Sequence, residues 1–174
     1  MPARRIRPRG FSLVEMLIVV AVILVIAAIA VPNLLRARAR ASESAAVASM
    51  RTINTAESMY YNAYPQVGYA GSLAELGSGG SSCESTSQSN ACIIMDNTLT
   101  SGLKSGYTFD LASDGQIPSQ GYMLTASPQS GPASGRCSFF SDQTGAISAG
   151  TSGGPRLPLD GHNCEQPVST ATFR

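Results

Sequence analysis

Residues 9–35 read RGFSLVEMLIVVAVILVIAAIAVPNLL, and this stretch decides the fold of the N-terminal part of the chain. From Phe11 to Leu35 the only ionised side chain is that of Glu15. About 20 apolar residues span a bilayer as an α-helix, so the stretch is long enough to do so. A secretory signal peptide has a shorter apolar region that ends in small residues at a cleavage site. Here the apolar run passes directly into a second helical pattern, so the sequence predicts a membrane helix.

Arginines flank the apolar stretch on both sides. Those before it would hold the N-terminus on the cytoplasmic side, because cytoplasmic flanks of membrane helices are rich in Lys and Arg. They are Arg4, Arg5, Arg7 and Arg9. Arg36, Arg38 and Arg40 follow the stretch and weaken this asymmetry. Without the first four arginines the chain carries 8 basic and 11 acidic groups, a net charge of −3. This balance argues against a nucleic-acid-binding domain, which would carry a basic patch.

Glu15 is the unusual residue of the apolar stretch. A carboxylate at the centre of a membrane helix costs roughly 2.5–3.5 kcal/mol, and less near the helix ends. In an uncut chain Glu15 would lie near the cytoplasmic interface and could reach water. If the chain were cut after Gly10, Phe11 would carry a new α-amino group one helical turn from Glu15. The amine and the carboxylate could then neutralise each other within one chain or between neighbouring chains.

The run Arg9-Gly10-Phe11-Ser12-Leu13-Val14-Glu15, followed by the apolar stretch, resembles the processing site of type IV prepilins. In that family a membrane-embedded aspartyl peptidase cuts after the glycine and methylates the new N-terminus. The resemblance implies cleavage between Gly10 and Phe11 and methylation of Phe11. It also implies that Glu15 sets the subunit register by meeting the N-terminal amine of an adjacent subunit. A glycine before the cut suits the extended backbone that a narrow protease cleft requires. The resemblance is strong over about the first 60 residues and loose beyond them.

Pro32 interrupts the helical pattern. It has no N–H to donate to the carbonyl group of Ala28, and its ring crowds the preceding turn. In pilins a proline at this place accompanies a kink or a locally melted stretch in the filament. We therefore expect a kink at Pro32, and we expect residues 22–32 to extend when subunits pack.

Residues 36–64 continue the helix, since Ala is abundant, Gly is absent and Pro65 supplies a stop. Apolar residues recur at steps of three and four and predict one buried stripe, which comprises Ala46, Met50, Ile53, Ala56, Tyr60 and Ala63. At 1.5 Å per residue the whole helix, residues 11–64, would be roughly 80 Å long. Five charged residues of this half either form salt bridges between subunits or lie on a solvated face; they are Arg36, Arg38, Arg40, Glu43 and Glu57. Tyr60, Tyr61, Tyr64 and Tyr69 are interpreted as packing between helix and sheet rather than as a path for electrons.

Residues 65–174 predict a small antiparallel sheet with many turns. A short helix is expected at residues 72–76 and a strand or short helix at 93–99. Strands are expected at 106–111, 121–126, 135–140 and 146–148, because short β-type runs alternate with turn residues. The fold class is therefore α+β, with a long N-terminal helix packed on a small C-terminal sheet, as in pilins. The expected segments are a leader at 1–10, a transmembrane and filament-core helix at 11–35, its amphipathic continuation at 36–64, and a globular domain at 65–174.

Four cysteines follow the apolar stretch, and an even number beyond a membrane helix predicts two disulfides in an oxidising compartment. Three pairings are possible. Cys83 with Cys92 and Cys137 with Cys164 are favoured, because each pair closes a local loop rich in Gly and Ser. A metal site is not expected, since the chain has no Cys-x-x-Cys and its only histidine is His162.

No residue pattern points to catalysis or to a cofactor. The single histidine and the absence of Gly-x-Ser-x-Gly give no support for a hydrolase triad. Asp110, Asp114 and Asp142 are interpreted as turn-forming residues rather than as a calcium site, since Asp favours turns and the EF-hand spacing is absent.

Three functions remain. The favoured one is a structural subunit of a type IV pilus serving adhesion, motility or DNA uptake. The alternative is a pseudopilin of a type II secretion system, and a membrane-anchored periplasmic enzyme or binding protein is a third. The partners implied are other copies of the chain, a prepilin peptidase, and an inner-membrane assembly platform with its ATPase. Nucleic acid could be a partner only through the assembled pilus. The chain would occupy the inner membrane before assembly and a cell-surface filament afterwards, or the periplasm in the pseudopilin case.

Overall fold

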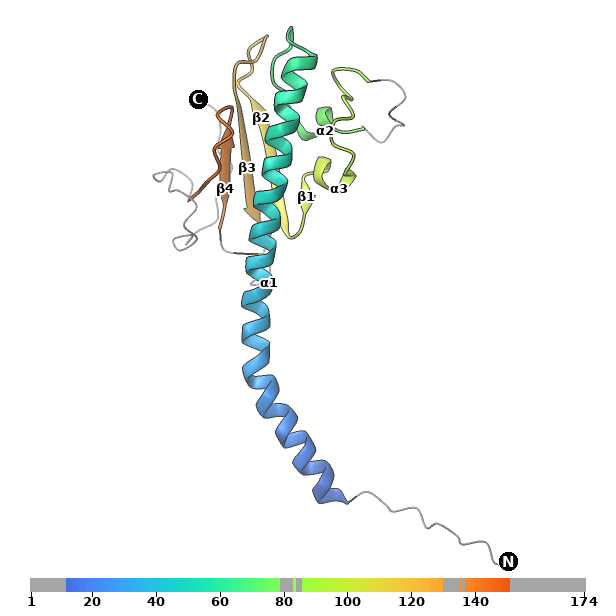
Figure 1. Cartoon of the computed structure of the whole chain (residues 1–174), viewed down its shortest axis with the longest axis vertical. Helices are drawn as coiled ribbons and strands as arrows, with labels where there is room; N and C mark the ends of the chain where they lie inside the picture. The colour runs from blue at the N-terminus through green and yellow to red at the C-terminus, as the bar shows by residue number, and fades with distance from the viewer. Residues whose placement is uncertain (1–11, 79–82, 84–85, 130–134, 136, 151–174) are drawn as a thin grey trace, which may run out of the picture.

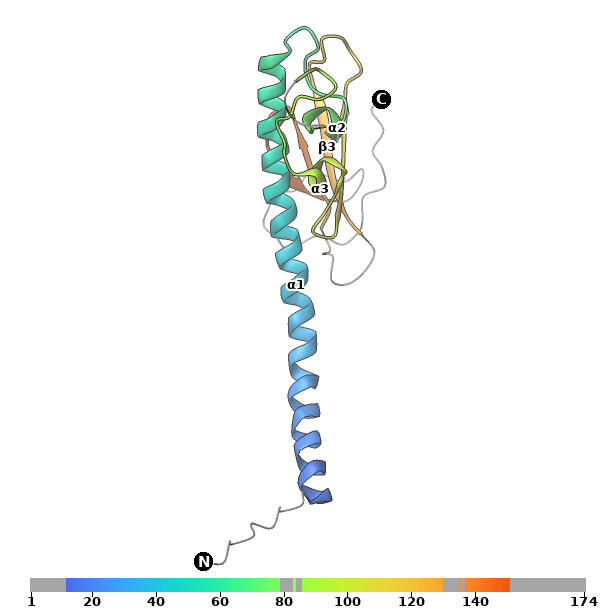
Figure 2. The same ribbon diagram turned by 90° about the vertical axis from the view of Figure 1, so that its right-hand side faces the viewer.

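A long helix and a five-stranded sheet make up the fold (Figure 1). The structure is a computed structural model that describes residues 12–78, 83, 86–129, 135 and 137–150. Helix α1 spans Leu13–Ala63. Its C-terminal half lies against the sheet, whereas its N-terminal half extends well beyond it, as the view turned by 90° also shows (Figure 2). This arrangement confirms the predicted α+β class and the long N-terminal helix.

The sheet is an antiparallel meander in which each strand pairs with the next one along the chain. The strands are β1 (Leu103–Lys104), β2 (Tyr107–Ser113), β3 (Tyr122–Pro128), β4 (Phe139–Asp142) and β5 (Ser148–Ala149). β2 and β3 pair along their whole length, with Phe109 opposite Ala126 and Leu111 opposite Leu124. Alternate residues face α1 because side chains of a strand point to opposite faces.

Three of the expected strands, 106–111, 121–126 and 146–148, agree with β2, β3 and β5 within two residues at each end, and the fourth differs. Expected strand 135–140 begins only at Phe139, because Cys137 and Ser138 precede the ladder with β3. Strand β1 was not predicted. It pairs with β2 through a two-residue turn in which Ser105 and Gly106 both have positive φ, the conformation that tight hairpins require. The Ser-Gly pair was the available signal for this hairpin.

The core lies between the C-terminal half of α1 and the sheet. Ala46, Met50, Ile53, Ala56 and Tyr60 are all buried, which confirms five members of the predicted stripe. The sheet contributes Tyr107, Phe109, Tyr122, Leu124, Ala126 and Phe139 to the same core. The prediction that Ala63 is buried was wrong. It is the last residue of α1, and the chain turns away at Tyr64 before any element can cover it.

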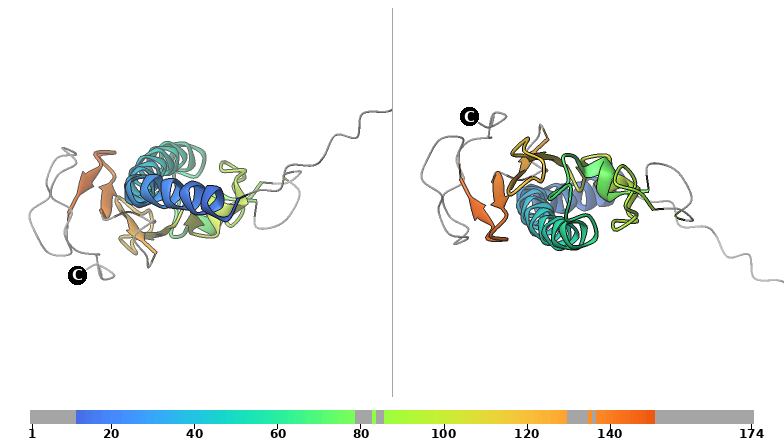
Figure 3. Two further views of the ribbon diagram at one scale, coloured as in Figure 1. Left: turned by 90° about the horizontal axis from the view of Figure 1, so that it is seen from below. Right: turned by 90° about the horizontal axis from the view of Figure 1, so that it is seen from above.

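Two short helices lie on the opposite side of α1 from β4 (Figures 1 and 3). They are α2 (Leu73–Leu76), which confirms the short helix expected at 72–76, and α3 (Asn97–Thr100). Asp96 caps α3 by accepting hydrogen bonds from the backbone N–H groups of Thr98 and Leu99. The expected element at 93–99 is therefore an extended segment that leads into a helix.

Cys83 and Cys92 form a disulfide bond that closes the loop before α3, as predicted. The Cys137–Cys164 pairing lies outside the described residues, since Cys164 belongs to the segment 151–174. His162 lies in that same segment. The predicted second disulfide therefore stays a prediction.

Candidate membrane and assembly segment on helix α1

The N-terminal half of α1 is an apolar rod without cover from the rest of the chain. In the described part of the chain, α1 is the helix long and apolar enough to cross a membrane, by length and composition alone. Large apolar side chains along residues 13–35 are exposed around the whole helix, from Leu13 to Leu35. These 23 residues extend about 34 Å at 1.5 Å per residue, close to the ~30 Å of a hydrocarbon core. The rod therefore needs a bilayer or other apolar helices around it.

Glu15 is the acidic residue in the first turn of this rod. Helix α1 begins at Leu13, and Ser12 at the N-cap position makes no side-chain capping hydrogen bond. A carboxylate in the first turn is favoured by the positive end of the helix dipole. Gly10 and Phe11 lie outside the described residues, so the predicted meeting of the Phe11 amine with Glu15 stays a prediction.

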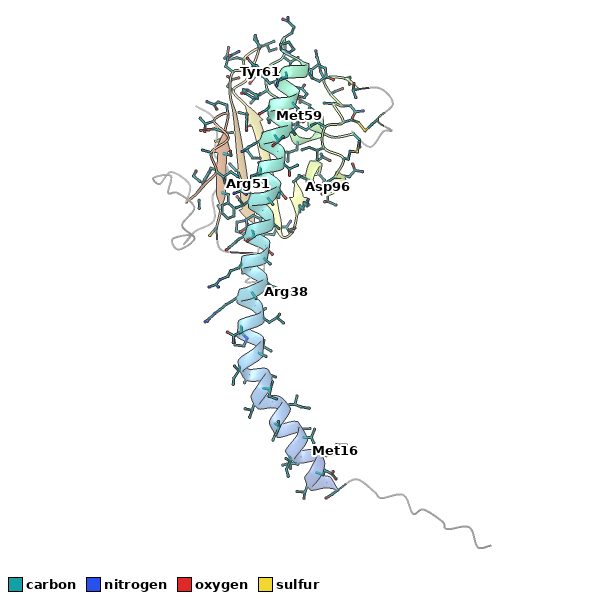
Figure 4. The ribbon with its side chains drawn as sticks, in the orientation of Figure 1. Met16, Arg38, Arg51, Met59, Tyr61 and Asp96 are labelled. Carbon is teal, nitrogen blue, oxygen red and sulfur yellow. A yellow bond between two sulfur atoms is a disulfide. The ribbon has the colours of Figure 1, made fainter. Side chains whose placement is uncertain are left out.

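The rod bends between Met16 and Arg38 (Figure 4). Pro32 lies within this interval, and α1 is helical on both sides of it. The side-chain amide of Asn33 donates to the carbonyl oxygen of Ile29 at 3.1 Å, so this turn carries a side-chain hydrogen bond beside the proline. A proline is an established cause of helix kinks. In the single chain residues 22–32 are helical, and their extension in a filament stays a prediction.

Three arginines follow the rod at once. Arg36, Arg38 and Arg40 are exposed, and none of them forms an ion pair with another described residue. The salt bridge found among the described residues joins Lys104 Nζ on β1 to Asp96 Oδ2 before α3, at 2.7 Å. These arginines fit both interpretations left open by the sequence, a solvated face and a contact with a partner.

Glu57 does not belong with the exposed charged residues, which corrects the grouping made from the sequence. Its side chain is 0% exposed and lies in the core between α1 and the segment before α2. Oε2 accepts a hydrogen bond from the backbone N–H of Ala70 at 3.0 Å. Oε1 has no hydrogen-bond partner among the described residues. Neither a salt bridge between subunits nor a solvated face fits this geometry.

Burial raises the pKa of Glu57 from 4.5 to about 8, because the surroundings cannot stabilise a carboxylate. The Ala70 hydrogen bond opposes this effect, and the nearby negative charge of Glu75 adds to it. Glu57 in turn contributes to the raised pKa of Tyr69 and Tyr122, where burial is the largest cause. Glu57 is therefore protonated at neutral pH in the folded chain.

The burial of Glu57 was not predicted, although its spacing in the sequence was a signal. It lies four residues after Ile53 and three before Tyr60, which places it in the stripe that the apolar pattern assigned to the core. Its neighbour on the same face, Asn54, is also buried. The Asn54 amide donates to Ser141 Oγ at 2.7 Å and accepts from the Tyr122 hydroxyl at 3.1 Å, which ties α1 to β3 and β4.

The tyrosines pack as the sequence predicted, between the helix and its surroundings. Tyr60 contacts Tyr64 with ring centroids 4.9 Å apart. Tyr69 contacts both Tyr61, at 4.8 Å, and Tyr122 on β3, at 5.0 Å. These contacts join the end of α1 to the loop and sheet that follow it.

The aspartates singled out in the sheet region form turns or lie on the surface. Asp114 accepts hydrogen bonds from the backbone N–H groups of Gln116 and Gln120. Asp142 accepts from the backbone N–H and the hydroxyl of Thr144. Asp110 lies exposed in the middle of β2. Across the described residues no group of three His, Cys, Asp or Glu side chains is placed to hold a metal ion.

Comparison with known proteins identifies the N-terminal segment. Residues 5–31 match the family model of the prokaryotic N-terminal methylation motif, and they contain Gly10, Phe11 and Glu15. The N-terminal segment of the chain therefore carries a prokaryotic N-terminal methylation motif.

Two curated relatives are similar to part of the chain. It is 41% identical over 56 residues to the type IV major pilin protein PilA of Myxococcus xanthus, a match that covers 32% of this chain and 26% of the relative. It is 42% identical over 52 residues to the type IV wide pilus major component PilA4 of Thermus thermophilus, over 30% of this chain and 40% of the relative. The matches thus span less than half of each relative. No solved structure matches the chain significantly.

Proposed function

We propose that this pilin-like chain is a structural subunit of a type IV pilus, cut between Gly10 and Phe11 and polymerised through α1. The observation that carries the proposal is the methylation motif at the start of a helix whose N-terminal half, residues 13–35, exposes its large apolar side chains. The two relatives are named as type IV pilus components, which favours a pilus over the pseudopilin alternative. In this role the chain would have no enzymatic activity of its own.

The energetics of the apolar rod support polymerisation. Full burial of one large aliphatic side chain contributes about 1.5–3 kcal/mol, and the rod exposes more than a dozen of them. The free-energy cost of exposing all of these side chains to water would therefore exceed the free energy of unfolding of an ordinary domain, which is about 5–15 kcal/mol. When the rod leaves the membrane, the rods of other copies must replace the lipid around it.

The proposed division of the chain follows from this role. Residues 1–10 are a leader, 11–35 the membrane and filament-core helix, 36–64 its amphipathic continuation, and 65–174 a globular domain on the filament exterior. The subunit would lie in the inner membrane before assembly and in a cell-surface filament afterwards. A prepilin peptidase, an inner-membrane platform and an assembly ATPase would act on it.

Glu15 is the residue proposed to set the subunit register. Inside a filament core its carboxylate would be surrounded by apolar rods, and an unpaired buried charge is strongly unfavourable. The methylated amine of Phe11 on an adjacent subunit would supply the opposite charge. Misplaced subunits would leave both charges unpaired, so only one axial register would be favourable.

The register role is tested by comparing Glu15→Ala with Met16→Ala. Both variants truncate one exposed side chain in the first turn of α1, and only the first removes the carboxylate. We expect both precursors to be cleaved, and we expect Glu15→Ala alone to give few filaments in the sheared fraction. Normal filaments from Glu15→Ala would refute the register role. Efficient cleavage after replacement of Gly10 by a bulky residue would refute the assigned cleavage site.

A further inference from the structure

The three arginines after the apolar rod form a collar around α1, and nothing in the assembly proposal uses them. We call Arg36, Arg38 and Arg40 the arginine collar. All three are exposed and without an ion pair among the described residues. Helical geometry places Arg36 and Arg40 about 40° apart around the axis and Arg38 on nearly the opposite side. The collar therefore presents positive charge on two sides of the helix.

The depth of the collar follows from the length of the rod. Residues 13–35 extend about 34 Å, slightly more than the ~30 Å hydrocarbon thickness. Arg36 comes directly after Leu35, and Arg40 lies only about 6 Å further along the axis. In a membrane-inserted chain the whole collar would lie at the depth of the lipid headgroups on the side of the globular domain.

The position of the collar is unusual, and it places three positive charges beside anions. Positive residues are normally concentrated on the cytoplasmic flank of a membrane helix, and the collar lies on the other flank. Lipid phosphates are the anions present at headgroup depth. A guanidinium group binds phosphate through two parallel N–H donors, and it is more weakly hydrated than an ammonium group. Charge and depth together therefore favour lipid phosphate as the occupant.

We propose that the arginine collar binds the phosphate groups of anionic phospholipids in the leaflet beneath the globular domain while the subunit is held in the membrane. The proposal rests on the proposed membrane insertion and adds a lipid-binding surface to it. The bound phosphates would fix the depth of α1, so that the globular domain stands just above the bilayer. Extraction of the subunit into a filament would have to break these contacts.

The test uses the full-length chain in vesicles or nanodiscs that contain phosphatidylglycerol and phosphatidylcholine. Lipids retained on the detergent-extracted protein are identified by native mass spectrometry. The key comparison is Arg38→Gln against Arg51→Gln, since both remove an exposed arginine from α1 and Arg51 lies about 20 Å further from the rod. We expect Arg38→Gln to lower the preference for phosphatidylglycerol about fivefold, the factor for about 1 kcal/mol per arginine at a membrane surface. Arg51→Gln should leave it unchanged, and replacement of the whole collar should abolish it.

Four results would overturn the proposal. One is a wild-type chain that inserts and shows no preference for the anionic lipid, which leaves the proposed membrane insertion intact. Another is equal lipid preference in Arg38→Gln and the wild type. If collar variants kept this preference but failed to form filaments, the collar would instead contact a second copy of the chain. A chain that alkaline carbonate removes from vesicles would refute membrane insertion itself and the lipid contact with it.

Discussion

Glu57 makes the stability of the globular part depend on pH in a direction opposite to that of most carboxylates. It is fully buried, with Oε2 hydrogen-bonded to Ala70 N–H and Oε1 without a partner among the described residues. The ionisable groups that act on it or respond to it are Glu75, Tyr60, Tyr69 and Tyr122, and none of these is a cation. The folded chain therefore favours the neutral acid, whereas the unfolded chain ionises it readily.

The sign and size of the effect follow from the two pKa values. The pKa of Glu57 is about 8 in the folded chain and near 4.5 when unfolded. Between these values unfolding releases a proton, so each pH unit removes about 1.4 kcal/mol from the free energy of unfolding. The stability contribution is complete below pH 4.5, falls as pH rises, and levels off above pH 8. The total loss is about 5 kcal/mol, of which about 3 kcal/mol is lost by pH 7.

Tyrosine near-UV circular dichroism provides the assay. The chain has no Trp, and all six tyrosines lie between residues 60 and 122, so this signal reports the globular part rather than the apolar rod. Denaturant unfolding of the full chain in detergent should be compared at pH 5 and pH 8 for the wild type and Glu57→Gln. Glutamine is a neutral isostere that can still accept from Ala70 N–H. Every other titratable group is the same in both proteins, so the difference between them isolates Glu57.

We expect the two proteins to have similar stability at pH 5. At pH 8 the free energy of unfolding of Glu57→Gln should exceed that of the wild type by about 4 kcal/mol, since only the wild type loses a proton on unfolding. Parallel pH dependence in the two proteins would show that Glu57 is not held neutral in the folded chain, and the reasoning from burial would then be wrong.

Two further predictions concern how α1 and the turns hold the globular part together. Gly68→Ala should cost more than 2 kcal/mol, because its φ is +87° and a Cβ would overlap the backbone oxygen of Ser119 in the β2–β3 loop. Gly115→Ala, with a φ of +75° and open space around it, should cost only about 1 kcal/mol; equal losses in denaturant unfolding would contradict the packing argument. Asn54→Ala should cost about 2–3 kcal/mol, because it leaves buried hydroxyl groups of β3 and β4 without a partner. Asn62→Ala removes an exposed amide of the same helix and should change stability by less than about 0.5 kcal/mol, so a similar loss in both would count against the buried network.

Helices and strands whose apolar residues recur at regular spacing were predictable from the sequence. The buried face of α1 follows from apolar residues at steps of three and four, since only one face of a helix can meet a sheet. The strands around Phe109 and Leu124 were predicted because β-type runs lie between turn residues there. The nearest cysteines pair as expected, since the intervening loop is short.

Features that depend on contacts between distant residues could not be predicted in this way. Glu57 was grouped with the exposed charges because residue type was weighed above spacing, yet its environment is set by Ala70 and by strand β3. Strand β1 has only two residues, so no run of β-type residues marks it. Gly68 and Ser119 form a β-bridge between two loops that are 51 residues apart in the sequence. Local sequence carries no signal for such a contact.

The candidate site itself was predicted mainly from its motif. Glu15 and the apolar rod lie where the sequence placed them, at the start of an uncovered helix. The role of Pro32 depends on how subunits pack, which a single chain does not contain. The depth of the arginine collar could be inferred only from the structure, because it depends on the rod having no contact with the globular part.

The central claim is that this chain is processed after Gly10 and assembled through the exposed rod. Intact and N-terminal mass spectrometry of the sheared surface fraction and the washed envelope tests it most directly. We expect abundant sheared protein that begins at N-methyl-Phe11. Protein that still carries residues 1–10 in both fractions would contradict it.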